Sequence, residues 1–267
     1  MSAVESPVSA LGRATIAAAS YVLSIATLIG YALRHLTKGR KLVPKVGREV
    51  LKRQILFTGV EALPFVGLIA VLTGAVVGVQ AILLSGAAGR DLLGTHLVTV
   101  LVRELGPLLV AFIVIGRSGA AIAAELASMR VHRELDSLEA MGVDPFDYLV
   151  IPRMAGVIVA IMGLTMAFIA TSLISGWIIL QVVGSTPTPL VDYATLIAAP
   201  LTFADLAILL AKTVVPGLLI AAIACHEGLT AGLSSTDVPR AATRGVVRSL
   251  SAVFLWSAGV TALAYLA

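Results

Sequence analysis

The sequence predicts an all-α polytopic membrane protein. Hydrophobic residues make up 58% of the 267-residue chain, charged residues make up only 13%, and the mean hydropathy is +1.01. The apolar fraction of a soluble domain is nearer one half, so this chain has more apolar surface than such a domain can hide. Its apolar segments are continuous and reach about 20 residues, the length of a helix that crosses the hydrocarbon core. A β-barrel would instead show alternating segments of about 10 residues.

The N-terminal part combines an apolar run with a basic segment. Residues 14–33 are apolar, and residues 34–53 are rich in Lys and Arg with a single acidic residue, Glu49. The positive-inside rule places the basic segment in the cytoplasm. Hydropathy alone favours residues 14–33 as a sixth span, whereas an interfacial position of this run would leave five spans.

Five further apolar segments are predicted to span the membrane, the last within a helix that begins near Thr243: residues 56–84, 97–115, 154–183, 206–223 and 253–266. Their polar connections indicate the sides. The connections at 117–153 and 231–248 carry Arg residues and are expected in the cytoplasm. The connection at 184–205 has three prolines and no Lys or Arg, so it is expected outside, with a short helix. The C-terminus is then also outside.

Glycines recur along the first of these spans, at Gly67, Gly74 and Gly78. Small residues at helix interfaces allow two backbones to approach closely in lipid. We therefore expect this span to pack closely against a neighbouring helix.

Motifs typical of several enzyme classes are absent from the sequence. Cys225 is the only cysteine, and the four histidines are scattered and form no HExxH motif, so no metal site is expected. The sequence contains no GxxxxGK[ST] motif, so ATP would have to be bound by another chain. The aromatic content of 5% is too low for a groove that stacks single-stranded nucleic acid. The sequence thus predicts neither an enzyme nor a cofactor site in this chain, and no nucleic-acid partner.

Five charged residues stand out in or beside the apolar runs: Arg103, Glu104, Lys212, Asp205 and Glu61. A central Arg, Lys or Asp in a membrane helix costs about 2.5–3.5 kcal/mol, so such residues usually face a partner or a cavity. Arg103 and Glu104 are adjacent and point about 100° apart on a helix, so each is expected to find a partner on another helix. Two interpretations stay open: a buried ion pair that orients helices, such as Glu104 with Lys212, or a polar patch in a substrate path.

The stretch ELDSLEAMGVDP, residues 134–145, gathers four carboxylates in an otherwise apolar chain. If residues 130–141 form a helix, Val131, Leu135, Leu138 and Met141 share one apolar stripe, with the acids on the other side. Gly142 fits a C-terminal cap, and Pro145 prevents continuation of the helix. Two interpretations remain: an acidic face in water, or a docking helix for a cytosolic partner.

A longer composite motif occupies residues 103–153: RELGPLLVAFIVIGRSGAAIAAELASMRVHRELDSLEAMGVDPFDYLVIPR. Together with PRAATRGVVRS at residues 239–249, it closely resembles the MlaE/YrbE permease family. The resemblance implies the transmembrane subunit of an ABC transporter that moves phospholipid or a related lipid between the inner membrane and the periplasmic side. It also implies an N-terminal interfacial elbow helix. The chain is thus expected to be one multi-pass permease domain, 1–267, with an N-terminal part (1–53), a five-helix core (54–267) and a periplasmic C-terminus.

The resemblance further implies three partners. They are a cytosolic ABC ATPase that binds the ATP, a second permease copy in a homodimer, and a periplasmic MCE-domain lipid-binding protein. The short helix at 130–141 corresponds to the family's coupling helix, which contacts the ATPase. The residues expected in that contact are Arg130, Arg133, Glu134, Asp136, Leu138, Glu139, Met141 and Asp144. The residues expected around the lipid are Arg103, Glu104, Asp205 and Lys212, together with Val77, Gln80 and Leu84 on the cavity wall.

Two alternatives from other classes remain. An ion- or proton-coupled secondary transporter would use Glu104 and Asp205 as its relay and would work in liposomes under a gradient, without an ATPase. A membrane scaffold would hold its charges only as structural ion pairs and would bind no lipid beyond the surrounding annulus.

Overall fold

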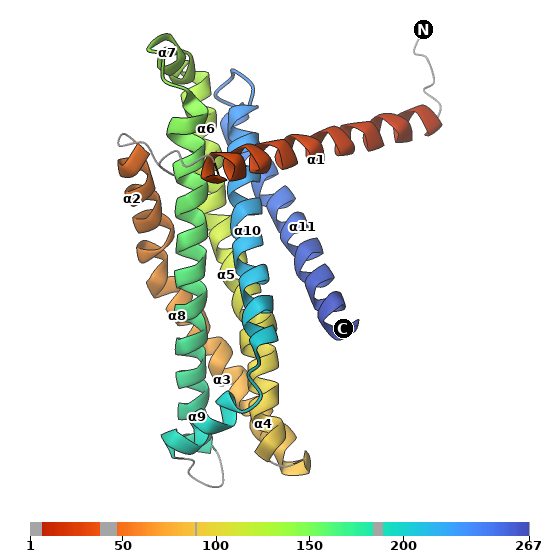
Figure 1. The fold of residues 1–267 in the computed structure, drawn as a ribbon, viewed down its shortest axis with the longest axis vertical. Helices are drawn as coiled ribbons and strands as arrows, with labels where there is room; N and C mark the ends of the chain where they lie inside the picture. The colour runs from red at the N-terminus through yellow and green to blue at the C-terminus, as the bar shows by residue number, and fades with distance from the viewer. Residues whose placement is uncertain (1–6, 38–46, 89, 184–188, 267) are drawn as a thin grey trace.

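In the computed structural model, residues 7–37, 47–88, 90–183 and 189–266 are described, and this part of the chain holds helices with short connections and no strands. Five helical segments in it are long and apolar enough to cross a membrane: Gly47–Leu83, Gly94–Val131, Phe146–Val183, Phe203–Leu229 and Asp237–Ala264. They run side by side as an elongated bundle (Figure 1). The predicted all-α membrane fold with five spans is confirmed.

The N-terminal helix α1 (Pro7–Thr37) lies across one end of this bundle, at a steep angle to the other helices (Figure 1). Its apolar stretch, Ala18–Ala32, is shorter than the about 20 residues that a span needs. Ile25 and Leu28 are buried against the bundle, whereas Val22 and Leu23 are exposed. The interfacial helix implied by the resemblance therefore agrees with the structure, and the sixth span favoured by hydropathy alone is wrong.

The first span joins α2 (Gly47–Thr58) to α3 (Leu63–Ala88) through a 3₁₀ turn, and α8 (Ile151–Val183) packs along both. The α3–α8 contact depends on small residues. A Cβ on Gly74 would overlap the backbone of Ser172, and one on Gly78 would lie 3.2 Å from the Cα of Gly176. The expected close approach is thus found at Gly74 and Gly78, whereas a Cβ on Gly67 would meet nothing within 4 Å.

The second span is one helical path. It contains α4 (Arg90–Leu97), α5 (Gly106–Val114) and α6 (Ala120–Val131), linked by the π-helical segments Val98–Leu105 and Ile115–Gly119.

The expectation that this helix ends at residue 115 and a polar connection begins at 117 is wrong. Arg117 is held against the first span: its guanidinium lies 2.7 Å from the carboxylate of Glu61 and donates to the carbonyl oxygen of Phe57 at 2.7 Å. Since its charge is paired within the bundle, the helix continues to Val131.

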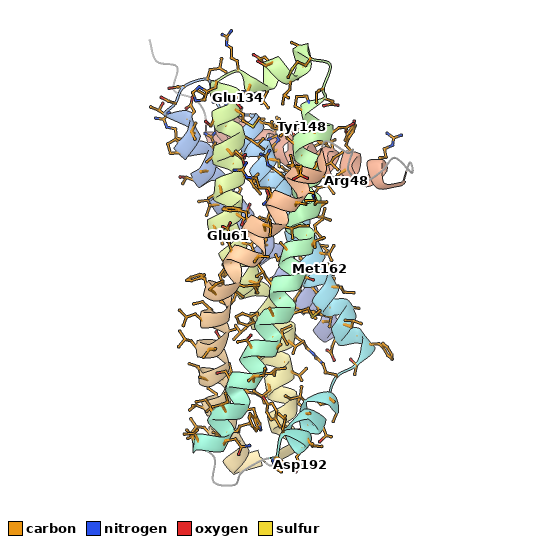
Figure 2. All side chains as sticks on the ribbon, turned by 90° about the vertical axis from the view of Figure 1, so that its left-hand side faces the viewer. Arg48, Glu61, Glu134, Tyr148, Met162 and Asp192 are labelled. Carbon is orange, nitrogen blue, oxygen red and sulfur yellow. The ribbon has the colours of Figure 1, made fainter. Side chains whose placement is uncertain are left out.

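The polar connection therefore shortens to a turn, the seven-residue helix α7 (Glu134–Ala140), and a loop to Phe146. Glu134 of α7 and Asp192 lie at opposite ends of the bundle (Figure 2). We call these the α7 end and the α9 end.

At the α9 end, a short helix appears as predicted, α9 (Leu190–Ala198). Burial raises the pKa of Tyr193 to about 12, so its hydroxyl stays protonated. This hydroxyl donates to the carbonyl oxygen of Leu173 at 3.0 Å and so fixes α9 to α8. Next, α10 (Phe203–Leu229) begins with a capping box formed by Thr202 and Asp205. The last helix, α11 (Asp237–Leu266), packs on α10 and α6 and then diverges from the bundle (Figure 1).

Candidate functional site

Lys212 is the centre of a polar cluster within the bundle, and its side chain is 1% exposed. Its ammonium group lies 2.7 Å from Oε1 of Glu104, 3.0 Å from the carbonyl oxygen of Arg103 and 2.6 Å from Oγ1 of Thr261. These three contacts use all three donors of a lysine ammonium group. The predicted pairing of Glu104 with Lys212 is therefore present, and Lys212 has no donor left for a ligand.

Arg103 pairs with a different acid. Its Nε contacts Oδ1 of Asp205, while the other carboxylate oxygen accepts hydrogen bonds from the backbone N–H and the hydroxyl of Thr202 at 2.8 and 2.9 Å. Asp205 thus caps α10 and binds Arg103 at the same time. Arg103 and Glu104 have partners at two different positions, as their separation around the helix predicted.

The local backbone helps to present these charges. Arg103 and Glu104 are in the π-helical segment Val98–Leu105, and such insertions are frequent at functional sites. The side chains of Arg103 and Glu104 keep 30% and 34% of their surface exposed, whereas those of Asp205 and Lys212 keep 2% and 1%. Of the two cations, only Arg103 is accessible to a ligand.

An apolar groove opens beside the Arg103–Asp205 pair. Its cavity volume is about 640 Å³, and it lies between α8, α9 and the start of α10. Asp205 is a charged residue at its edge, and its walls are formed by apolar side chains such as Met166, Leu173, Ile197 and Leu206. The groove thus joins an apolar surface to a pair formed by a buried carboxylate and a partly exposed guanidinium.

The cluster as a whole is electrically neutral, because two cations face two carboxylates. A lone charge in this setting would be costly, whereas paired charges can remain in the bundle. An anionic group could be accommodated by the terminal N–H groups of Arg103 while its Nε stays on Asp205. Asp205 would still accept its two hydrogen bonds from Thr202.

Val77, Gln80 and Leu84 of the first span were expected on the cavity wall, and only part of this set lies near the site. Val77 is 3% exposed and packs in the same buried cluster as Val102, Ile169 and Leu209, so it supports the groove from behind. Gln80 is exposed on α3 and does not line the groove. The side chain of Leu84 lies outside the described residues.

The short helix at the α7 end begins later than predicted. Arg130 and Val131 belong to α6, and Arg133 has a left-handed backbone with φ of 57°, which separates α6 from α7. The single helix predicted over 130–141 is therefore wrong. The period of the apolar residues did not reveal the turn at 132–133.

The predicted end of α7 is confirmed. Gly142 has φ of +75°, and its N–H donates to the carbonyl oxygen of Glu139 while that of Val143 donates to Leu138. These two bonds form a Schellman motif. Asp144 then accepts a hydrogen bond from the N–H of Phe146 at 2.9 Å and so starts the next helical segment.

The coupling residues expected from the sequence divide into two groups. Arg130 donates to the carbonyl oxygen of Leu229, which ties α6 to the end of α10, and Leu138 packs inward. The remaining residues are exposed at the α7 end: Arg133, Glu134, Asp136, Glu139, Met141 and Asp144. A groove of about 480 Å³ runs beside them, with Asp136 and Glu139 on its edge.

A second buried acid was missed from the sequence. Glu227 of α10 is 2% exposed and receives Arg244 at 3.1 Å and Arg248 in direct contact, both from α11. The guanidinium of Arg248 in turn lies 4.2 Å from the ring centroid of Tyr21 in α1. The available signal was an acid at the end of one apolar run followed by arginines at helical spacing in the next segment. Thr261 gave no such signal, since a Thr in a helix usually bonds its own backbone.

Comparisons with known proteins agree with this architecture. The family model described as Permease MlaE matches residues 51–263. A probable ABC transporter permease protein of Rickettsia typhi is 32% identical over 224 residues, which are 83% of this chain and 85% of that protein. A probable ABC transporter permease protein of Synechocystis is 30% identical over 234 residues, with 85% and 84% covered. The chloroplastic protein TRIGALACTOSYLDIACYLGLYCEROL 1 of Arabidopsis thaliana is 32% identical over 154 residues, with 57% and 43% covered.

The five apolar helices and these matches define a multi-pass membrane protein of the ABC transporter permease class. The chain belongs to the MlaE permease family. A subunit of this class implies a partner ATPase and pairing with a second permease.

Proposed function

We propose that this permease moves phospholipid or a related lipid between the inner membrane and the periplasmic side, with ATP bound and hydrolysed by a separate cytosolic ATPase. The observation that carries the proposal is the partly exposed Arg103, whose partner Asp205 lines an apolar groove of about 640 Å³. Such a site combines a surface for acyl chains with a guanidinium that can pair with a phosphate. The name of the Arabidopsis relative, which is that of a glycolipid, also supports a lipid substrate.

In this mechanism the acyl chains lie in the groove, and the headgroup binds the terminal N–H groups of Arg103. Glu104 and Lys212 keep the helices in place, because their contacts are saturated. The exposed acids of α7 bind the ATPase, and its movement changes the affinity of the groove for lipid. A shift of this kind requires different lipid affinities in the two states.

The proposed arrangement places the α7 end in the cytoplasm and the C-terminus in the periplasm, in line with the basic segment at 34–53. A periplasmic MCE-domain protein would receive or deliver the lipid at the other side. The second permease copy would complete the cavity around the α9 end.

The test is Arg103→Gln in the permease reconstituted with its ATPase. Lys52→Gln is the control, because Lys52 is an exposed cation that pairs with Glu49 on its own helix. Loss of one charge-assisted contact predicts a roughly tenfold drop in co-purified lipid, measured by mass spectrometry, and in ATP-driven lipid transfer. Unchanged binding and transfer would remove Arg103 from the site.

The secondary-transporter alternative is not favoured, because Glu104 and Asp205 are each bound to a cation rather than to each other. It predicts gradient-driven transport by this chain alone in liposomes. The lipid proposal predicts no transport there until the ATPase and ATP are added.

A further inference from the structure

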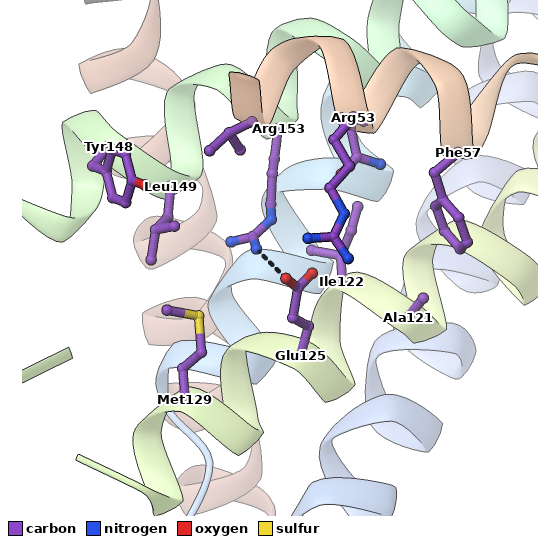
Figure 3. A pocket seen from close by; sticks show the side chains of 11 residues that line it. Arg53, Phe57, Ala121, Ile122, Glu125, Met129, Tyr148, Leu149 and Arg153 are labelled. Atoms are coloured by element: carbon purple, nitrogen blue, oxygen red, sulfur yellow. Dashed lines mark ion pairs between the residues drawn. The ribbon is translucent and has the colours of Figure 1, made fainter. Parts of the chain in front are cut away.

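A separate pocket lies at the α7 end, between α2, α6 and the start of α8 (Figure 3). Its cavity volume is about 440 Å³, and Phe57, Ile122, Met129 and Leu149 form apolar walls. None of its lining residues belongs to the groove beside Arg103. Its charged lining residues are Arg53, Glu125 and Arg153, so it holds two guanidinium groups and one carboxylate.

Arg153 is buried and only half satisfied. Its side chain is 5% exposed, and Nη2 lies 3.0 Å from Oε1 of Glu125. Among the described residues, its other terminal nitrogen, Nη1, is buried without a hydrogen-bond partner. An unpaired buried donor on a charged group is unfavourable, so a ligand that accepts this hydrogen bond would be stabilised.

A second guanidinium comes from the neighbouring helix α2, which packs on α8. Arg53 of α2 points into the pocket toward Glu125 (Figure 3). Within the described part of the chain it has no ion pair or hydrogen bond, and it is exposed. Since Glu125 can neutralise only one of the two arginines, the pocket keeps one excess positive charge. The guanidinium groups of Arg53 and Arg153 flank Glu125 (Figure 3), and both keep N–H donors that the oxygens of a phosphate group could accept.

The surroundings indicate where the phosphate would come from. Leu56 of α2 and Val60 of the following 3₁₀ turn are neighbours in sequence of the lining residue Phe57, and they are 55% and 52% exposed. Both belong to the first span, which is among the helices apolar enough to lie in a membrane. A lipid could therefore place its chains against these two side chains and its headgroup in the pocket, at the end of the bundle that adjoins the basic segment.

We propose that this pocket binds the phosphate of an anionic phospholipid from the leaflet at the α7 end. Nη1 of Arg153 and the guanidinium of Arg53 donate to the phosphate oxygens, and Glu125 holds Arg153 in position. This site does not depend on the proposed transport function, because binding is measured without an ATPase or turnover.

The test compares two arginines of the same helix in the purified full-length permease. Arg53→Gln removes the accessible donor of the pocket. Arg48→Gln removes an exposed arginine of α2 that does not line it. Each variant is titrated with phosphatidylglycerol or phosphatidylcholine in detergent, and retained lipid is counted by native mass spectrometry. We expect Arg53→Gln to weaken phosphatidylglycerol retention roughly tenfold, with Arg48→Gln close to wild type.

A second variant tests the cavity itself without changing charge. Ala121→Leu places a larger apolar side chain on the pocket wall and should reduce phosphatidylglycerol retention as Arg53→Gln does. Equal effects of Arg53→Gln and Arg48→Gln would mean a diffuse electrostatic effect and would overturn the proposal. Displacement of phosphatidylglycerol by millimolar inorganic phosphate would assign the site to a soluble anion. It would overturn the proposal that the phosphate belongs to a lipid.

Loss of phosphatidylglycerol retention in Arg103→Gln, with Arg53→Gln unchanged, would contradict this site while supporting the groove beside Arg103. The reverse pattern would support the pocket alone. The proposed pocket and the proposed transport site beside Arg103 can therefore be disproved independently of each other.

Discussion

Tyr21 of α1 lies beneath the guanidinium of Arg248 of α11, and Arg248 contacts Glu227 of α10. The ring centroid of Tyr21 is 4.2 Å from Cζ of Arg248, within the range of a cation–π contact. The N-terminal helix α1 is joined at this point to α10 and α11, the last two helices of the chain. The helix that lies across the bundle is thus fixed by an aromatic contact with a charge that is itself paired.

Tyr21→Leu should loosen α1, because leucine keeps apolar volume but removes the π face. A contact of this kind contributes about 1 kcal/mol, which corresponds to a roughly fivefold rise in local opening. Amide hydrogen exchange over Ala18–Ala32 reports the change. Tyr21→Phe keeps the ring and should stay near wild type, and equal exchange in the two variants would contradict the cation–π interpretation.

Lys212→Met should destabilise the permease, because it leaves Glu104 without its cation. We expect a loss of about 2–4 kcal/mol, less than for a fully buried pair because Glu104 keeps 34% of its side chain exposed. The melting temperature in detergent measures the effect. Adding Glu104→Gln should restore much of the loss, since it removes the unpaired charge. A double variant as unstable as Lys212→Met would show that the pair is not the cause.

Gly74→Ala should separate α3 from α8, because the added Cβ would overlap the backbone of Ser172. Overpacking of this kind costs about 1–3 kcal/mol. Gly67→Ala is the matched control on the same helix, since a Cβ there meets nothing within 4 Å and alanine favours helix. The difference in melting temperature between the two variants is the measurement, and equal values would exclude the close contact as the reason.

Asp136→Lys should weaken association with the ATPase if α7 is the coupling helix. Reversal of one charge at an interface edge predicts roughly tenfold weaker binding at low salt, and the difference should shrink as salt screens the charge. Asp192→Lys makes the same change on α9, at the opposite end of the bundle, and should have no effect (Figure 2). Pull-down affinity and stimulated ATP hydrolysis test both variants. If Asp136→Lys binds the ATPase and stimulates hydrolysis as the wild type does, the acids of α7 form an acidic face in water and do not contact the ATPase.

The features that depend on composition and length could be predicted from the sequence. The five spans, the close approach at Gly74 and Gly78, and the Glu104–Lys212 pair follow from the cost of exposing charge or backbone in lipid. Tertiary pairing could not be predicted in the same way. Arg117 resembled the start of a polar connection because its partner, Glu61, is 56 residues earlier in the chain.

The start of α7 was missed for a different reason. Val131 and Leu135 are spaced as on one helix, yet the left-handed backbone of Arg133 lies between them. Arginine has no special preference for that conformation, so an arginine at position 133 does not indicate a turn. The end of α7 was easier to predict, because Gly142 is the residue type that a positive φ favours.

The unbroken helical path from Gly94 to Val131 has a mechanical consequence. It carries Glu104 near one end and joins α7 at the other, about 40 Å away at 1.5 Å per residue. A lever of that length converts a tilt of about 5° at the α7 end into a displacement of roughly 3 Å at Glu104. Hydrogen bonds hold over only about 2.7–3.2 Å, so the 2.7 Å contact of Glu104 with Lys212 is kept only if α10 moves together with the second span.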